Sequence, residues 1–200
     1  MHWMNKLERK IGRYAIPNLI IYILVAYGIG YALLLLGPLN EIFYTIYEGL
    51  QMNPERIFHG QIWRLVTWIT CVPSGLSIFT IFMFIFYYWI GQTLERVWGA
   101  FRYNVYMFMG FFLTGLGPII MYLIIGILYG FDFANLASDW GSFTSNTYYL
   151  NLTSFLAFAL IFPDHEVYLM FIFRIKMKWL AIIDGIILAY EFAVYIVRAA

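Results

Sequence analysis

Long apolar stretches separated by short polar ones run along the whole chain, and they set the elements that the sequence predicts. Residues 14–40 carry no charged side chain, and the apolar run at 17–36 has the length of a helix that crosses a bilayer. Four further apolar stretches predict helices at about 77–93, 103–131, 148–162 and 179–197. The pattern therefore predicts an all-α polytopic membrane protein, a helical bundle with five transmembrane helices.

Proline and glycine positions predict where these helices begin, bend and end. The break at 73–75 delays the start of the second helix. In the third, Pro118 close to Gly115 and Gly117 predicts a kink. The fourth segment, 148–162, is about fifteen residues long, which is short for a helix that faces lipid. We therefore expect the fourth helix to lie inside the bundle.

The composition agrees with a lipid environment and excludes several other classes of protein. Of 200 residues 63% are hydrophobic and only 12% charged, and the mean hydropathy is +0.77. A net charge of +1 provides no broad basic surface, so we expect no nucleic-acid partner. Cys71 is the only cysteine, which excludes an intramolecular disulfide and a cysteine-based metal site. We expect neither a metal nor a cofactor.

The basic residues predict how the chain is oriented. If the chain crosses the membrane at each predicted span, nine of the twelve Lys and Arg residues lie on the same side as the N-terminus. By the positive-inside rule this side is cytoplasmic, which makes 1–14 a cytoplasmic basic segment. The run at 17–36 is too long for a signal peptide and lacks a cleavage site, so we expect an uncleaved anchor. The segments 37–76 and 130–147 are then outer loops, the first of them membrane-associated.

Several short motifs lie in the first outer loop and near the end of the second predicted helix. The loop contains the pair Trp63-Arg64 within the segment His-Gly-Gln-Ile-Trp-Arg-Leu-Val-Thr, and Gly91 opens a Gly-x-x-Leu-Glu turn that includes Glu95 and is followed by Gly99. With the stretch 162–181, these residues resemble the rhomboid superfamily over most of 57–185. The resemblance implies one rhomboid-like membrane domain over 1–200 and a core of six helices, of which this chain offers five.

The catalytic positions of a rhomboid protease are not matched. The resemblance aligns Phe79 and Met83 with the His-x-x-x-Asn pair that donates to the oxyanion, and neither side chain is a hydrogen-bond donor. Thr153 aligns with the nucleophilic serine but lacks its flanking glycines, and Ser154 is one place further on. No histidine follows His165 to act as the base that such a nucleophile needs. For Thr153 and Ser154 we expect helix capping and packing, with an active intramembrane protease as the alternative.

A non-catalytic chain with these motifs is similar to rhomboid pseudoproteases, and derlins are the nearest comparison. Derlins too combine a Trp-Arg-x-x-Thr loop with a Leu-Glu after the second helix and no catalytic residues. The resemblance implies a protein that binds or handles transmembrane segments of other membrane proteins. The expected partners are therefore the lipid bilayer and the transmembrane segments of client proteins.

Charged residues within or beside the spans have structural interpretations as well as functional ones. We expect Arg64 to hydrogen-bond loop carbonyls and Glu95 to cap backbone groups between the second and third helices. Asp184 and Glu191 are seven residues apart on one face of the fifth helix. Because acids in a membrane are costly unless they face protein or water, the two belong to an internal hydrogen-bond network or to a polar groove. A groove would make the chain a small transporter.

Overall fold

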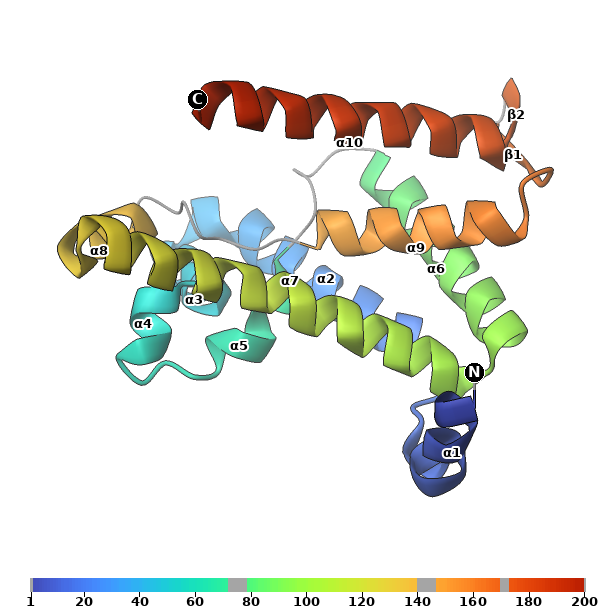
Figure 1. The fold of residues 1–200 in the computed structure, drawn as a ribbon, viewed down its shortest axis with the longest axis horizontal. Helices are drawn as coiled ribbons and strands as arrows, with labels where there is room; N and C mark the ends of the chain where they lie inside the picture. The colour runs from blue at the N-terminus through green and yellow to red at the C-terminus, as the bar shows by residue number, and fades with distance from the viewer. Residues whose placement is uncertain (1, 72–78, 140–146, 170–172, 200) are drawn as a thin grey trace. The chain divides into compact units, whose positions relative to one another are not determined.

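The computed structural model describes residues 2–71, 79–139, 147–169 and 173–199 (Figure 1). The chain divides into two compact units, Met1–Leu150 and Asn151–Ala200, which we describe one at a time. The first unit contains the helices α1 (His2–Ile11), α2 (Leu19–Leu36), α3 (Glu41–Leu50), α4 (Pro54–Phe58), α5 (Arg64–Thr67), α6 (Phe79–Trp98), α7 (Ala100–Tyr129) and α8 (Phe131–Asp139), with short 3-10 turns at Gly12–Tyr14, Gly37–Leu39 and Trp68–Thr70. Helix α9 (Tyr148–Ile161) crosses the division.

A helix forms at each of the five apolar stretches, as α2, α6, α7, α9 and α10 (Met177–Ala199). Among the residues that the structure describes, Leu19–Leu39 and Ala100–Tyr129 are long and apolar enough to cross a membrane. Helix α9 is apolar but shorter, as its sequence predicts. The predominantly helical fold is confirmed, whereas the number of five spans stays a prediction.

The core of the first unit lies where α2 packs against α6 and α3, and where α6 packs against α7. At the crossing of α2 and α6, Gly91 has no side chain, and a Cβ atom there would lie 2.7 Å from the Cβ of Ile20 and 2.8 Å from the hydroxyl of Tyr103. Leu94 and Tyr103 are completely buried beside this crossing. The glycine therefore sets how closely α2 and α6 approach each other.

The polar stretch 130–147, expected to be a loop, contains helix α8, and this corrects the sequence interpretation. Gly130, with φ of 93°, ends α7, and α8 folds back onto it (Figure 1). Ala134 is buried against Tyr122 of α7, whose hydroxyl donates to Oδ1 of Asn135 at 2.6 Å. Tertiary packing of small residues, rather than an apolar run, therefore holds this helix.

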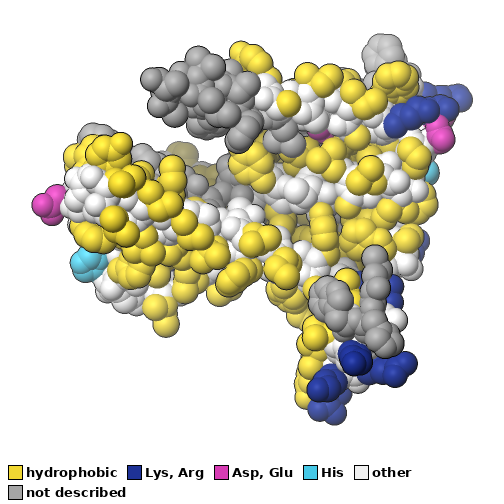
Figure 2. Space-filling model, in the orientation of Figure 1, with side chains coloured by type: hydrophobic (Ala, Val, Ile, Leu, Met, Phe, Trp, Pro, Cys, Tyr) yellow, Lys and Arg dark blue, Asp and Glu magenta, His cyan; other side chains and the backbone are white. Residues whose placement is uncertain are grey.

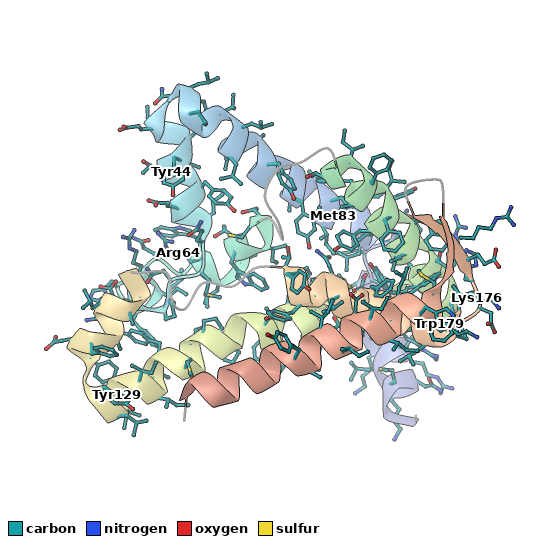
Figure 3. The ribbon with its side chains drawn as sticks, turned by 90° about the horizontal axis from the view of Figure 1, so that it is seen from above. Tyr44, Arg64, Met83, Tyr129, Lys176 and Trp179 are labelled. Atoms are coloured by element: carbon teal, nitrogen blue, oxygen red, sulfur yellow. The ribbon has the colours of Figure 1, made fainter. Side chains whose placement is uncertain are left out.

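The second unit contains an element that the sequence analysis did not predict. Strands β1 (Glu166–Leu169) and β2 (Phe173–Lys176) form an antiparallel hairpin in which Glu166 pairs with Lys176. Just before β1, Asp164 accepts hydrogen bonds from Nζ of Lys176 at 3.3 Å and from Nζ of Lys178 at 3.0 Å. Figure 3 shows Lys176 where the hairpin joins α10. The connection between α9 and α10 is thus a hairpin with charged side chains at its base.

Candidate functional site

Arg64, at the start of α5, is the centre of the first loop (Figure 3). Its side chain is only 2% exposed, and its Nη1 atom donates to the carbonyls of Glu48 at 2.8 Å and Gln51 at 2.7 Å. Its Nε atom donates to Oε1 of Gln61 at 2.6 Å. Burial, and then the nearby Arg56, lower the pKa of Arg64, yet a guanidinium stays protonated. The hydrogen bonds to loop carbonyls that the sequence predicts for Arg64 are confirmed.

Two neighbours of Arg64 continue the same pattern along the end of α3. Nε1 of Trp63 donates to the carbonyl of Gly49 at 3.3 Å, and the hydroxyl of Thr67 donates to the carbonyl of Leu50 at 3.0 Å. With the two carbonyls bound by Arg64, the Trp-Arg-x-x-Thr segment covers successive carbonyls from Glu48 to Gln51. The last carbonyls of a helix have no partner within the helix, and a cation there also suits the helix dipole. The motif is therefore the C-terminal cap of α3.

The N-terminal ends of the loop helices are capped too, and one cap reaches α8. The side chain of Asn40 accepts the backbone N–H of Ile42 at 3.0 Å at the start of α3. At the start of α4, Oδ1 of Asn53 accepts the N–H of Arg56 at 3.0 Å and the hydroxyl of Ser138 at 2.9 Å. Asparagine at these positions satisfies N–H groups that a helix leaves open. The loop helices are thus held to each other and to α8 by polar contacts.

Trp68 fixes the loop to α7. Its side chain is 1% exposed and meets Phe111 edge-on, with ring centroids 6.0 Å apart. A Cβ atom at Gly115 would lie 3.1 Å from the indole nitrogen, so this glycine makes room for the ring. Just beyond, the hydroxyl of Thr147 donates to the carbonyl of Cys71 at 3.1 Å. Burial raises the pKa of the Cys71 thiol to about 12, which keeps it protonated.

The outer surface of this loop carries many large apolar side chains, beside the exposed polar residues Glu41, Glu48, Arg56 and His59. Its exposed large hydrophobic side chains are Ile42, Tyr44, Ile46, Phe58, Ile62, Trp63, Leu65 and Val66. Figure 2 shows hydrophobic side chains over the region of α4, α5 and α8. Contiguous exposed apolar surface of this kind marks contact with a membrane or with another protein. The polar hydrogen bonds are therefore inside the loop, and its apolar side chains are outside.

Glu95 caps a different helix from the one expected. Its Oε1 atom accepts the backbone N–H of Asn18 at 2.7 Å, and Nε2 of Gln92 donates to Oδ1 of Asn18 at 2.8 Å. Asn18 has φ of 54° and immediately precedes α2. Glu95 therefore holds the start of the first membrane helix, which corrects the expected cap between the second and third helices. Gly99, with φ of 82°, provides the turn from α6 to α7.

The positions compared with the protease catalytic residues lie on α6 and α9. Met83 is half-buried on α6 (Figure 3), and the side chain of Phe79 lies outside the described residues. On α9 Thr153 is exposed, whereas Ser154 is buried two turns before the helix ends. His165 follows α9, and its ring meets Phe158 edge-on with centroids 6.1 Å apart. The absence of a catalytic role stays a prediction.

The two acids of the predicted fifth span are described only in part. Asp184 is half-buried on α10, and the side chain of Glu191 lies outside the described residues. Among the described residues, no group of three or more His, Cys, Asp or Glu is placed to hold a metal ion. Both interpretations of the acidic pair stay predictions.

Comparison with protein families decides the class of the chain. A family model described as eukaryotic integral membrane protein (DUF1751) matches residues 19–200. The chain belongs to this family. The match begins at the first residue of α2 and includes the Arg64 cap, Glu95 and the hairpin, and it leaves α1 and Asn18 outside. No curated protein and no solved structure matches the chain. Membership establishes an integral membrane protein, in agreement with the apolar helices.

Proposed function

We propose that this family member is a rhomboid-like, non-catalytic membrane protein, comparable to derlins, that binds transmembrane segments of other membrane proteins. The observation that carries the proposal is the loop formed by α3, α4 and α5. The carbonyls at the end of α3 are bonded internally by Trp63, Arg64 and Thr67, and large apolar side chains cover much of its exterior. Irregular backbone persists at membrane depth only where its polar groups are bonded within the protein, and this loop meets that requirement.

The lengths of the membrane helices support a site for partner helices. Thirty residues of α7 span about 45 Å, and fourteen residues of α9 span about 21 Å, against a hydrocarbon core of about 30 Å. A helix shorter than the bilayer thins the lipid around it. A partner helix that carries polar residues meets less hydrocarbon in such a region, so it is held at a lower free-energy cost than in undisturbed lipid.

Binding can be measured by energy transfer between the full chain and model transmembrane peptides in liposomes. We expect a peptide with a central Asn or Gln to bind more tightly than an all-Leu peptide of equal length. Arg64→Ala, which uncaps α3, should weaken this preference, whereas Arg56→Ala, at an exposed position on α4, should retain it. Equal binding of the two peptides would contradict the proposal.

Two further experiments distinguish the proposal from the alternatives. Labelling by a fluorophosphonate probe that Ser154→Ala or Thr153→Ala abolishes would establish a protease. Ion or proton flux in liposomes that Asp184→Asn abolishes would establish a transporter. We expect neither labelling nor flux from the unmodified protein.

A further inference from the structure

Helix α1 precedes the part of the chain that the family model matches, and its side chains divide among three faces. At 100° per residue, Asn5 and Glu8 share one face, and Leu7 and Ile11 share a second. The third face carries the basic side chains Lys6, Arg9 and Lys10. A helix with an apolar face beside a basic one has the pattern of a helix that lies in the plane of a membrane surface.

The first face fixes α1 to the body of its unit. Nε of Arg102, near the start of α7, lies 3.4 Å from Oε2 of Glu8, and its Nη2 atom donates to Oδ1 of Asn5 at 3.1 Å. Only residues 12–18 separate α1 from the first membrane helix. The Arg102 contacts and this short connection keep α1 beside the end of the membrane helices, at the level where a bilayer surface lies.

The other two faces are not covered by the described residues of the first unit. Leu7 and Ile11 are exposed, as are Lys6, Arg9 and Lys10. Nearby, Arg13 lies over the ring of Tyr14, 4.8 Å from its centroid, and Tyr14 is 68% exposed. Apolar and cationic groups are therefore presented together.

Charge gathers at this end of the first unit. The basic residues there are Lys6, Arg9, Lys10, Arg13, Arg96 and Arg102. Glu8, paired with Arg102, and Glu95, bonded to the backbone of Asn18, are the acids close to them. Figure 2 shows the dark blue side chains of Lys and Arg grouped around α1. The basic residues thus outnumber the acidic ones, and the resulting positive charge complements an anionic surface.

We propose that α1 is an in-plane helix that binds anionic phospholipids of the cytoplasmic leaflet, with Lys6, Arg9 and Lys10 on the headgroup phosphates and Leu7 and Ile11 among the upper acyl chains. Each basic side chain near such a surface strengthens binding roughly fivefold, at about 1 kcal/mol per charge. The apolar face adds contact area that a soluble acidic protein would not need. The proposal is independent of client binding, because it concerns residues outside the α3–α5 loop.

The test measures how deep α1 lies in the membrane. The full chain, with Cys71→Ser to remove the native thiol and Leu7→Cys to carry a spin label, is reconstituted in nanodiscs of phosphatidylcholine alone or with 30% phosphatidylserine. Collisions of the label with oxygen, relative to a neutral nickel chelate, report its depth. We expect the oxygen-to-nickel accessibility ratio to rise at least twofold with phosphatidylserine and to fall back in 0.5 M salt.

Charge-matched variants show which basic residues are responsible. Lys6→Gln/Arg9→Gln/Lys10→Gln should abolish the response to phosphatidylserine. Arg174→Gln/Lys176→Gln/Lys178→Gln removes equal charge from the hairpin and the start of α10 and should leave the response intact. Thermal unfolding of each variant verifies that it folds. A label that stays in water in both lipid mixtures would overturn the proposal, and so would a response that survives neutralisation of α1.

Discussion

The carboxylate of Glu95 on α6 accepts the backbone N–H of Asn18, the residue before the first membrane helix, across 77 positions of sequence at 2.7 Å. Its other oxygen is buried without a hydrogen-bond partner. Only one oxygen of Glu95 therefore contacts the Asn18 backbone, and Nε2 of Gln92 donates a second hydrogen bond to the side chain of Asn18. The start of α2 thus depends on a single acceptor that comes from α6.

Replacing Glu95 by Gln should be tolerated better than Ala, because the amide retains an acceptor for Asn18 and replaces the unpartnered carboxylate oxygen by an uncharged NH2 group. Glu95→Ala should lower the free energy of unfolding by about 1–3 kcal/mol, since it leaves the Asn18 N–H open. Thermal unfolding in detergent measures both. Glu41→Ala, at an exposed glutamate in the first turn of α3, is the control. Equal losses for Gln and Ala at position 95 would show that the hydrogen bond is not the cause.

Arg64→Lys should not preserve the full stability of the loop formed by α3, α4 and α5. A lysine has no planar fork to reach Gln61 and the two carbonyls at once, so we expect only partial retention of stability. Arg64→Ala strands these acceptors and should cost about 3 kcal/mol or more, at 1.5–3 kcal/mol for each bond to a charged group. Differential scanning calorimetry of the purified proteins measures the unfolding temperature of each variant and so ranks their stabilities. A lysine variant as stable as the unmodified protein would refute the capping role of the guanidinium.

Gly91→Ala and Gly28→Ala form a matched pair. The new Cβ at position 91 would press on Ile20 and Tyr103, and overpacking of this kind costs about 1–3 kcal/mol. At position 28, within α2, a Cβ meets nothing within 4 Å, and alanine favours a helix over glycine. We expect a lower unfolding temperature for the first variant and an unchanged or higher one for the second. The reverse order would contradict the packing described for α2 and α6.

Asp164 makes the hairpin sensitive to acid. Hydrogen bonds from Lys178 and then Lys176 hold the pKa of its carboxyl below the ordinary value. The stabilisation from these contacts is therefore complete above the unfolded pKa, near 4, and is lost as the pH falls through the lower folded pKa. A carbon-detected titration of Asp164 should show this lowered pKa. Lys178→Gln should raise it toward the ordinary value, and an unchanged pKa would rule out the pairing.

The orientation predicted from basic charge can be tested with an impermeant maleimide. In a Cys71→Ser background, cysteines at Asp164 and Asp132 should react from opposite sides of the membrane. Asp132 is exposed at the start of α8, which makes it a better site than the buried Ser138 in the same helix. Reaction of both cysteines from one side would remove a span or reverse the orientation.

The sequence predicts those features that local patterns determine. Uninterrupted apolar runs locate α2 and α7, because burial of backbone in lipid requires a helix there. The contacts of Arg64 are also predictable. Its partners lie 3 to 16 residues before it in the sequence, and a buried guanidinium must find acceptors.

Features that depend on distant partners escape the same reasoning. Helix α8 is held by Ala134 against Tyr122, a contact that its mixed polar sequence does not indicate. The pairing of Glu166 with Lys176 forms only when the hairpin closes. Asn18 and Glu95 come together only after α2 and α6 pack, so no local pattern identifies the cap.

The cap at the end of α3 also sets an order of events during synthesis. Its donors, Trp63, Arg64 and Thr67, follow their acceptors by 13–17 residues, so α3 is completed as soon as the ribosome has released the loop. The N–H of Asn18, in contrast, waits for Glu95. We therefore expect the cap of α3 to form while the start of α2 still lacks the acceptor that α6 provides.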